Sequence, residues 1–325
     1  MDDLAQPDPS APSGAAPRVG LLGPSGTFAE LALDTQPDLA AGELHWYRTM
    51  PDVLWAVADG AVDVGLVAIE NSIEGTVNIT SDTLVFDVDV LIQRELVINV
   101  HQHLLGVPGA SVDQVTHVAS IPVAIAQCHA FLTAHLPQAE HQPWNSTAEA
   151  AQQVRDGDDP TVAAIGNELA AKKFGLDILA RGIEDHPENQ TRFVVVQKGV
   201  IPPPTGHDKT SIMVEQRADR PGSLLAILQE FAARSINLTK LESRPTKKAL
   251  GDYCFLLDLE GHVADDVVAD CLRALQTKHG TVKFLGSYPS AASEGPAARA
   301  EVDEAAREAE SWLADIRTRI TTIGG

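Results

Sequence analysis

Short apolar runs alternate with amphipathic stretches over residues 18–199. Residues 19–22 and 64–69 are continuous apolar runs, which is the pattern of a buried strand. Apolar side chains recur at helical spacing over residues 51–59, and Gly60 then provides a stop. Strands that alternate with helices predict an α/β domain with largely parallel sheets, long enough for two lobes with a cleft between them.

Local signals add one helix start and two more strands. Thr27 and Glu30 have the T-x-x-E spacing of a capping box and follow the first predicted strand. Two strand-like runs follow one another at residues 87–96 and 97–107.

Three consecutive prolines at residues 202–204 interrupt this pattern and predict a linker. The sequence beyond them predicts the order strand, helix, strand, strand, helix, strand, which is a ferredoxin-like unit. Residues 301–320 predict a helix that carries Trp312, Leu313 and Ile316 as a docking or oligomer element, with a flexible tail as the alternative. The expected parts are a disordered tail at 1–17, an α/β domain at 18–199, a linker at 200–207, the ferredoxin-like domain at 208–289 and an acidic extension at 290–325.

Charge and cysteine usage limit the kinds of partner. The formal net charge of −21 repels polyanions, so nucleic acid and acidic membrane surfaces are not expected partners. Cys128, Cys254 and Cys271 are odd in number and widely spaced, as expected for reduced thiols and not for a disulfide framework. The N-terminal residues do not resemble a signal peptide, and no apolar stretch approaches the ~18 residues that span a membrane. We therefore expect a cytoplasmic protein.

Polar residues gather where predicted strands end and helices begin. The stretches are G-P-S-G-T-F at residues 23–28, E-N-S at 70–72, N-S-T at 145–147 and N-Q-T-R at 189–192. Each has a structural alternative as a turn or a helix cap, and Ser146 or Thr147 is a natural N-cap. Together they offer hydroxyls, amides and backbone donors at strand ends. Such groups suit a small, multiply anionic ligand and a reaction that needs no metal or redox cofactor.

Motifs for other chemistries do not occur in the sequence. His101 and His103 lie on one face of a strand-like run, but no carboxylate or cysteine stands near them in sequence to complete a metal site. The chain has no Walker loop, G-x-G-x-x-G, H-E-x-x-H or G-x-S-x-G motif. Nucleotide binding and serine-hydrolase chemistry are therefore not expected.

Taken together, these stretches resemble the prephenate dehydratase family. The family patterns G-P-x-G-[ST]-[FY], E-N-S-x-x-G-x-V, S-T-A-x-A-A and N-x-T-R-F match residues 23–28, 70–77, 146–151 and 189–193. The second domain resembles an ACT module, with E-S-R-P at residues 242–245. The resemblance implies a two-lobed fold like that of type II periplasmic binding proteins, with the site in the cleft and a ferredoxin-like ACT domain after it.

Two positions depart from the family pattern. The family usually reads S-H-P before the Q-C helix, whereas this chain has Ile121 in the place of the histidine, so no role is assigned there. The regulatory loop often reads G-A-L, and Ser223 replaces the alanine here. We expect that second change to tune effector affinity.

The resemblance also implies a reaction, the decarboxylating dehydration of prephenate to phenylpyruvate in L-phenylalanine biosynthesis, by a carbon–oxygen lyase without a cofactor. Thr191 would act on the leaving hydroxyl as hydrogen-bond donor or general acid. Arg192 would anchor a substrate carboxylate or be structural, and side-chain alternation along a strand favours the structural role. The other implied substrate-binding residues are Thr27, Asn71, Ser72, Asn145, Ser146 and Thr147.

The ACT resemblance implies feedback inhibition by L-phenylalanine, with activation by another amino acid as the alternative. The effector site would lie between paired modules, so a homodimer or homotetramer is expected. The implied effector-binding residues are Arg220, Pro221, Gly222, Ser223, Leu224, Asn237, Leu238, Glu242, Ser243 and Arg244.

Two rival functions remain open at this point. An arogenate dehydratase removes the same groups from the transaminated substrate and differs only at the keto or amino group. A non-catalytic two-lobed receptor with an amino-acid-sensing ACT module is the rival from another class, and the presence of Thr191 argues against it. No chorismate mutase-like helical segment precedes Arg18, so we expect a monofunctional enzyme.

Overall fold

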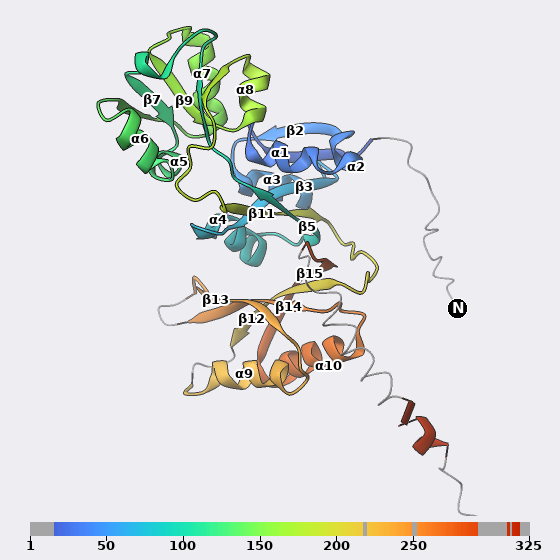
Figure 1. Cartoon of the computed structure of the whole chain (residues 1–325). Coiled ribbons are helices and arrows are strands. Elements are labelled where there is room, and N and C mark those ends of the chain that lie inside the picture. Colours follow the sequence, from blue (N-terminus) through green and yellow to red (C-terminus); the bar gives the residue numbers. More distant parts are fainter. Residues whose placement is uncertain (1–15, 217–219, 249–251, 292–310, 313, 319–325) are drawn as a thin grey trace, which may run out of the picture. The chain divides into compact units, whose positions relative to one another are not determined.

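The computed structural model describes residues 16–216, 220–248, 252–291, 311–312 and 314–318. Contacts divide the chain into two units. The first comprises Met1–Thr80 and Ile98–Thr191, and the second comprises Ser81–Val97 and Arg192–Gly325. The strands of the described residues form three sheets (Figure 1).

The first sheet has the strand order β2-β1-β3-β11-β5, with the short β4 paired to β3. Strand β1 runs parallel to both β2 and β3, so Gly20 lies opposite His45 on one side and Gly65 on the other. The strands are β1 (Arg18–Leu22), β2 (Glu43–Tyr47), β3 (Val64–Asn71), β4 (Gly75–Thr76), β5 (Leu91–Asn99) and β11 (Gln190–Gln197). The helices of this part of the chain are α1 (Phe28–Asp34), α2 (Pro37–Ala40), α3 (Met50–Ala58) and α4 (Asn78–Asp82).

The start of α1 differs in one respect from the sequence prediction. Thr27 is the N-cap, and its side chain accepts from the Glu30 backbone N–H. The Glu30 carboxylate does not return to Thr27, because it accepts from the Gly26 N–H at 2.6 Å and from the Ser25 hydroxyl at 3.0 Å. The predicted reciprocal capping box at Thr27 is therefore wrong in its second half.

The second sheet has the order β10-β6-β9-β7-β8. Strand β7 is parallel to β8 and β9, whereas β6 pairs antiparallel with both β9 and β10. The strands are β6 (His103–Gly106), β7 (His117–Ser120), β8 (Glu140–Pro143), β9 (Val162–Gly166) and β10 (Asp177–Ala180). The helices are α5 (Pro122–Ala126), α6 (His129–His135), α7 (Thr147–Gly157) and α8 (Glu168–Phe174), with a 3₁₀ turn at Val112–Gln114.

Alternate side chains of these strands enter two separate cores, one on each face of the second sheet. Val118 and Ile165 pack with Cys128 and residues of α6 in one core. Ala119 and Ala164 pack with alanines of α7 and α8 in the other. The sheet is thus covered by helices on both faces, which is why its strands read as continuous apolar runs.

The predicted strands at residues 87–96 and 97–107 are wrong in their boundaries. A single strand, β5, runs through the expected break, and β6 begins only at His103. The Val88 N–H donates to the Thr83 carbonyl at 3.1 Å and closes a π-helical turn, Thr83–Asp87. The predicted strand therefore starts at the last residue of a helical segment, and its buried residues Val88 and Val90 precede β5.

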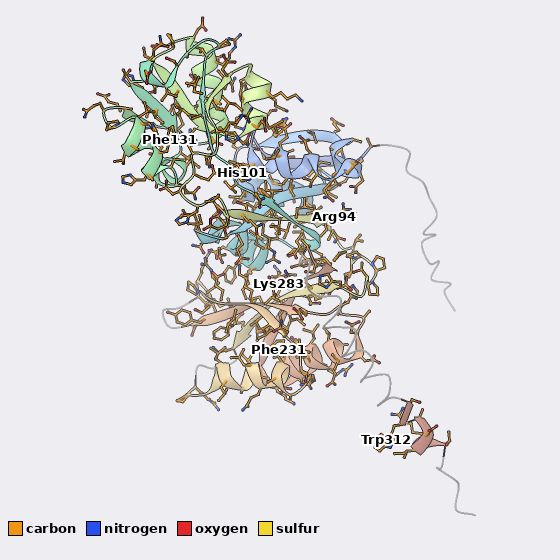
Figure 2. The ribbon with its side chains drawn as sticks, in the orientation of Figure 1. Arg94, His101, Phe131, Phe231, Lys283 and Trp312 are labelled. Carbon is orange, nitrogen blue, oxygen red and sulfur yellow. The ribbon has the colours of Figure 1, made fainter. Side chains whose placement is uncertain are left out.

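The third sheet, with the order β13-β14-β12-β15, is antiparallel throughout. Phe231 of α9, which is 1% exposed, lies in the core between the sheet and two helices (Figure 2). The elements are β12 (Asp208–Gln216), α9 (Ser223–Ala232), β13 (Leu238–Pro245), β14 (Tyr253–Glu260), α10 (Asp266–Ala274), a π-helical turn at Leu275–His279 and β15 (Gly280–Pro289). The predicted order strand, helix, strand, strand, helix, strand is confirmed, as is the two-lobed α/β class of the preceding part.

The predicted C-terminal helix lies largely outside the described residues. Residues 311–312 and 314–317 are helical, and Trp312 is 66% exposed (Figure 2). Leu313 is outside the described residues, as are the first fifteen residues of the predicted N-terminal tail. Within the part of the chain that the structure describes, no helix is both long and apolar enough to cross a membrane.

Candidate active site

The hydroxyl of Thr191 is held by an amide at the end of a neighbouring strand. Asn71 is the last residue of β3, and its Nδ2 donates to Thr191 Oγ1 at 3.0 Å. The same Nδ2 lies 2.9 Å from Asn189 Oδ1 and 3.1 Å from the Gln190 carbonyl. A hydroxyl whose oxygen accepts from an N–H keeps its own hydrogen to donate elsewhere.

The orientation of the Asn71 amide follows from its other partners. Its Oδ1 accepts from the backbone N–H groups of Ile73 and Glu74, each at 3.0 Å. Because a backbone N–H can only donate, the atom that faces these two groups must be the oxygen. The Nδ2 therefore faces Thr191, and Asn71 acts toward that residue as a donor.

Ser72 and Asn189 secure the start of β11 beside Thr191. Ser72 Oγ accepts from the Gln190 N–H at 2.9 Å and donates to Asn189 Oδ1 at 3.3 Å. Asn189 is 1% exposed, and its Nδ2 lies 3.5 Å from Gln127 Oε1, at the end of α5. These contacts favour a positioning role for Asn71 and Ser72, whereas the family resemblance implied direct contacts with substrate.

A cleft of about 1130 Å³ lies in the first unit. Gly23 and Pro24, after β1, contribute to its wall, and so do Asn145 and Ser146 at the start of α7. Residues before α1, which follows the first strand of the first sheet, and residues at the start of α7, which packs on the second sheet, thus line the same cleft. Eight residues were expected at the catalytic and substrate-binding site. Of these, Asn145 and Ser146 line this cleft, whereas Thr191 does not line it and contacts Asn71 instead.

The cleft and the contact between Asn71 and Thr191 both involve residues at the ends of strands of the first sheet. Strands β1 and β3 are parallel neighbours, with Leu21 opposite Leu66. Gly23 follows the end of β1 and Asn71 ends β3, so both belong to the carboxyl edge of these strands. In open α/β sheets, ligands bind at this edge.

Three of the predicted substrate-binding residues shape helix starts. Ser146 is the N-cap of α7, and its Oγ accepts from the Glu149 N–H at 2.9 Å. Thr147 is the first residue of that helix and is 6% exposed. Thr27 is 7% exposed, and its hydroxyl donates to the Leu22 carbonyl at 3.3 Å. These contacts favour structural roles for Thr27 and Thr147, whereas the sequence predicted contacts with substrate.

The glycine-rich loop between β1 and α1 is tied to α8. Lys173 forms an ion pair with the buried carboxylate of Glu30, and its Nζ donates to Ser25 Oγ at 2.6 Å. Asn167, the N-cap of α8, donates to the Gly26 carbonyl at 3.1 Å. Residues of α8 and its N-cap, about 140 positions further along the chain, therefore hold this loop in place. Local sequence signals did not connect the two segments.

Arg192 has three partners in the second unit. Its guanidinium contacts Glu95 at 2.6 Å, Asp258 at 2.7 Å and the Tyr288 hydroxyl at 2.8 Å, and the side chain is 11% exposed. Burial alone would lower the pKa of Arg192, but its anionic neighbours outweigh burial and raise it. This geometry favours the structural alternative for Arg192 over a direct contact with a substrate carboxylate.

The cleft also contains a cation that the motifs did not indicate. Arg48 follows β2 and lines the cleft, and no carboxylate of the described residues forms an ion pair with it. The acidic side chains of the lining are already engaged. Asp52 accepts from the Thr49 N–H at 3.1 Å, and Glu149 accepts from Asn145 Nδ2 at 3.1 Å. Arg48 is therefore available to bind an anion.

Ile121, which stands where the family usually has histidine, is the N-cap residue of α5 and makes no side-chain cap hydrogen bond. Its partly buried side chain packs against the core that contains Ala124 and Cys128. Burial raises the pKa of the Cys128 thiol to about 12, so this neighbour is a neutral core residue at physiological pH. The position thus serves packing in this chain.

A second pocket, of about 600 Å³, lies in the ferredoxin-like module. Five of the predicted effector-binding residues line it, namely Arg220, Gly222, Ser223, Leu224 and Ser243. Tyr253 and Phe255 of β14 add aromatic surface that the sequence analysis did not include. The pocket joins one guanidinium, hydroxyls and aromatic rings, which suits a small amino acid with an apolar side chain.

The remaining predicted effector residues do not line that pocket. They are Pro221, Asn237, Leu238, Glu242 and Arg244. Asn237 donates to Glu260 Oε1 at 3.0 Å, and Arg244 forms ion pairs with Asp82 and Glu242. Asn237 thus has its partner within the module, whereas Arg244 also contacts Asp82 at the end of α4.

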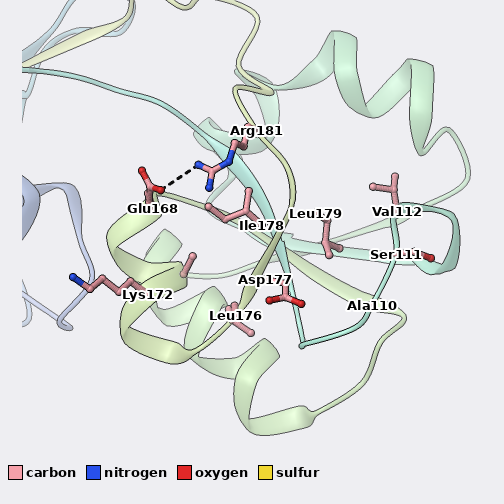
Figure 3. Close-up of a pocket in the computed structure, with 11 residues that line it drawn as sticks. Ala110, Ser111, Val112, Glu168, Lys172, Leu176, Asp177, Ile178, Leu179 and Arg181 are labelled. Atoms are coloured by element: carbon pink, nitrogen blue, oxygen red, sulfur yellow. Dashed lines mark hydrogen bonds and ion pairs between the residues drawn. The ribbon is translucent and has the colours of Figure 1, made fainter.

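A third pocket, of about 920 Å³, contains none of the predicted site residues (Figure 3). It lies beside α8 and β10, and the one ion pair drawn there joins Arg181 to Glu168 at 3.2 Å. The two histidines considered for metal binding are engaged elsewhere, because His101 contacts Glu184 and His103 accepts from the Gly182 N–H. The described residues contain no group of histidine, cysteine and carboxylate side chains that could hold a metal ion.

Comparisons with known proteins bear on both parts of the chain. The family model "Prephenate dehydratase" matches residues 19–200, and the family model "ACT domain" matches residues 210–276. A prephenate dehydratase of Mycobacterium tuberculosis (strain ATCC 25618 / H37Rv) is 42% identical over 315 residues, which cover 92% of this chain and 94% of the relative.

Two solved structures are similar to most of this chain. A prephenate dehydratase from Arthrobacter aurescens in complex with L-Phe aligns with a TM-score of 0.80 and 36% identity, covering 93% of this chain and 99% of that chain. A quorum quenching acylase named GqqA aligns with a TM-score of 0.76 and 28% identity, covering 84% of this chain and 98% of that chain.

Proposed function

This chain belongs to the prephenate dehydratase family, and from that premise we propose that it converts prephenate to phenylpyruvate, with release of CO2 and water. The reaction breaks the bond between the ring and its carboxylate, and the electron pair enters the ring as the C–O bond of the ring hydroxyl breaks. The departing oxygen takes up one proton to form water. Because the ring becomes aromatic, the catalyst mainly holds geometry and assists departure of the hydroxyl.

The observation that carries this proposal is the contact of Asn71 with Thr191. With Asn71 Nδ2 donating to Oγ1 at 3.0 Å, the Thr191 hydroxyl can direct its hydrogen at the leaving oxygen. Thr191 then recovers a proton from solvent. Placement, and not intrinsic acidity, makes threonine suitable, since an unactivated hydroxyl is a weak acid in water.

The cleft provides groups for the two carboxylates of prephenate. The start of α7 presents Ser146, whose hydroxyl hydrogen is not used in its capping bond, and the positive end of an eleven-residue helix. Arg48 adds a guanidinium, the group best suited to bind a carboxylate through two hydrogen bonds. These local donors matter because the net charge of −21 gives a dianion no long-range attraction.

We further propose that L-phenylalanine inhibits the enzyme through the pocket of the ACT domain. Arg220 would bind the effector carboxylate, and Tyr253 and Phe255 would contact its ring. The complex of the Arthrobacter aurescens relative with L-Phe supports the choice of ligand. In this proposal the protein is a cytoplasmic homodimer or homotetramer that functions in L-phenylalanine biosynthesis, with residues 18–199 as its catalytic domain and 208–289 as its regulatory domain.

The proposal is tested by a steady-state assay of the purified protein with prephenate, following phenylpyruvate with and without L-phenylalanine. Turnover that falls as L-phenylalanine rises through the millimolar range is the expected result. Turnover with arogenate and not with prephenate would establish the arogenate dehydratase instead. Hydrolysis of an N-acyl amide without turnover of either acid would assign the chain to acylase chemistry like that named for GqqA.

A further inference from the structure

A buried charged cluster in the second unit joins β11 to three strands of the regulatory domain. Arg192 of β11 contacts Asp258 of β14 and Tyr288 of β15, at 2.7 Å and 2.8 Å. It also contacts Glu95 of β5, at 2.6 Å. Asp258 is 5% exposed and Tyr288 is 0% exposed. Arg192 is the residue that follows Thr191.

A further set of hydrogen bonds fixes the partners of Arg192. Ser211 of β12 donates to Asp258 Oδ1 at 2.6 Å and contacts the Tyr288 hydroxyl at 2.6 Å. Lys209 of β12 contacts both oxygens of Glu95, at 2.9 Å and 3.0 Å. Each carboxylate of the cluster therefore has partners on two sides.

The charges in this cluster are held in their ionised forms. Burial alone would raise the pKa of Asp258, but the Arg192 guanidinium and the Ser211 hydroxyl outweigh burial and lower it. The pKa of Glu95 is lowered in the same way, by Arg192 and Lys209 against the effect of burial.

A contribution to the stability of the fold does not by itself explain why these charged residues are buried together. A buried ion pair contributes little net stability compared with apolar side chains of the same volume, because both charges lose their hydration. What the cluster does provide is a fixed position, since the planar guanidinium of Arg192 is bonded on three sides. Fixing that side chain fixes the backbone of β11 at the residue next to Thr191.

We propose that Asp258 and Tyr288 are positioning residues, through which the regulatory domain sets the placement of Thr191 by way of Arg192. The inference rests on the proposed function of Thr191. It makes the ACT domain a contributor to basal turnover as well as the site of regulation. It also supplies a route for regulation, because Phe255 of the effector pocket and Asp258 lie on the same strand, three residues apart.

The test compares two substitutions that each remove one buried hydroxyl from the regulatory domain. Tyr288→Phe removes a partner of Arg192 and keeps the ring. Thr210→Val is the matched control, because Thr210 is 0% exposed and bonds to the Gly261 carbonyl at 2.6 Å and to Ser287 Oγ at 2.7 Å. Thermal unfolding midpoints of both variants report any general loss of stability.

Tyr288→Phe is expected to lower kcat with prephenate about tenfold, with KM within about twofold of the wild type. Thr210→Val is expected to keep the wild-type kcat. In an Arg192→Lys background, the effect of Tyr288→Phe on kcat should shrink, because the two residues act through one contact. Hydrogen exchange of the amides of β11 should quicken in Tyr288→Phe and not in Thr210→Val.

Wild-type kcat and exchange in Tyr288→Phe would overturn the inference, and so would equal losses of kcat in both variants. A wild-type protein that does not turn over prephenate rejects the proposed function instead. The exchange comparison would then still decide whether Tyr288 holds β11 in place.

Discussion

In the proposed reaction, the role of the Thr191 hydroxyl depends on the amide that faces it. Asn71 has its Oδ1 occupied by the N–H groups of Ile73 and Glu74, so its Nδ2 is directed at Thr191 Oγ1. The threonine hydrogen then remains for a ligand. The proposed role of Thr191 therefore requires Asn71 to be a hydrogen-bond donor, and not merely a polar residue.

Asn71→Asp changes this property with almost no change of shape. The carboxylate cannot donate to Thr191, and it would instead accept the hydrogen that the account assigns to the leaving group. We expect kcat with prephenate to fall by about 10²-fold or more, with the far-UV circular dichroism of the wild type. If Asn71→Asp kept the wild-type kcat, Asn71 would have no role in orienting the hydroxyl.

The next prediction concerns the binding of prephenate by Arg48. Arg48→Gln removes the charge that lines the cleft, and we expect KM for prephenate to rise about tenfold with kcat within about twofold. Arg155→Gln is the matched control, since Arg155 is an exposed arginine of α7 outside the lining of the cleft. Equal changes of KM in the two variants would indicate a general effect of net charge and would remove Arg48 from the site.

At the level of helices and strands, the sequence correctly predicted those features that depend on residues close together in the chain. The sequence indicated Ser146 or Thr147 as the cap of α7, and the structure has Ser146 in that place. It also indicated the apolar run of β3, because hydroxyl caps and buried strands leave patterns within a few residues. It misplaced β5, because a π-helical turn uses the N–H of Val88, and apolar composition alone does not reveal that hydrogen bond.

Contacts between distant segments were not predictable in this way. Lys173 meets Glu30 across 143 positions, and Arg48 shares a cleft with α7, about 100 positions further along the chain. Motif resemblance indicated the loop and the helix separately. It gave no sign that Arg48 lines the same cleft, since Arg48 belongs to none of the matched motifs.

Close packing of α8 against Gly26, in the loop before α1, leads to a prediction about the stability of the fold. Gly26 has φ +93°, and an added Cβ would lie 3.2 Å from the Phe174 ring and 3.4 Å from the Ala170 Cα. Gly60 has φ +76° with nothing within 4 Å, so Gly60→Ala incurs only the conformational cost of about 1–2 kcal/mol. Gly26→Ala should therefore lower the thermal unfolding midpoint further than Gly60→Ala. An equal or smaller decrease would show that α8 does not pack tightly on this loop.

For the whole molecule, acid stability follows from the charged cluster of the second unit. The folded-state pKa values of Glu95 and Asp258 are lowered, so their contribution to the free energy of unfolding is fully present above the unfolded values of about 4. It is lost as pH falls below that range toward the folded values. Chemical denaturation at a series of pH values below 5 should therefore show a steep loss of stability in the wild type.

Asp258→Asn removes one of these titrating groups. Its free energy of unfolding should be lower at neutral pH and should fall less steeply with acid than that of the wild type. Parallel curves for the two proteins would mean that the pKa of Asp258 is the same in the folded and unfolded states, and the stabilisation of its charge by Arg192 would have to be abandoned.

The proposed action of the Thr191 hydroxyl on the departing oxygen is best tested by comparing three proteins. The measurement is kcat with prephenate for the wild type, Thr191→Ser and Thr191→Val. Serine keeps the hydroxyl, whereas valine keeps the shape and removes it. We expect kcat of Thr191→Ser to stay within about tenfold of the wild type, and kcat of Thr191→Val to fall by about 10²–10⁴-fold with an unchanged unfolding midpoint. A Thr191→Val protein that turns over prephenate as fast as Thr191→Ser would show that the hydroxyl takes no part in the reaction.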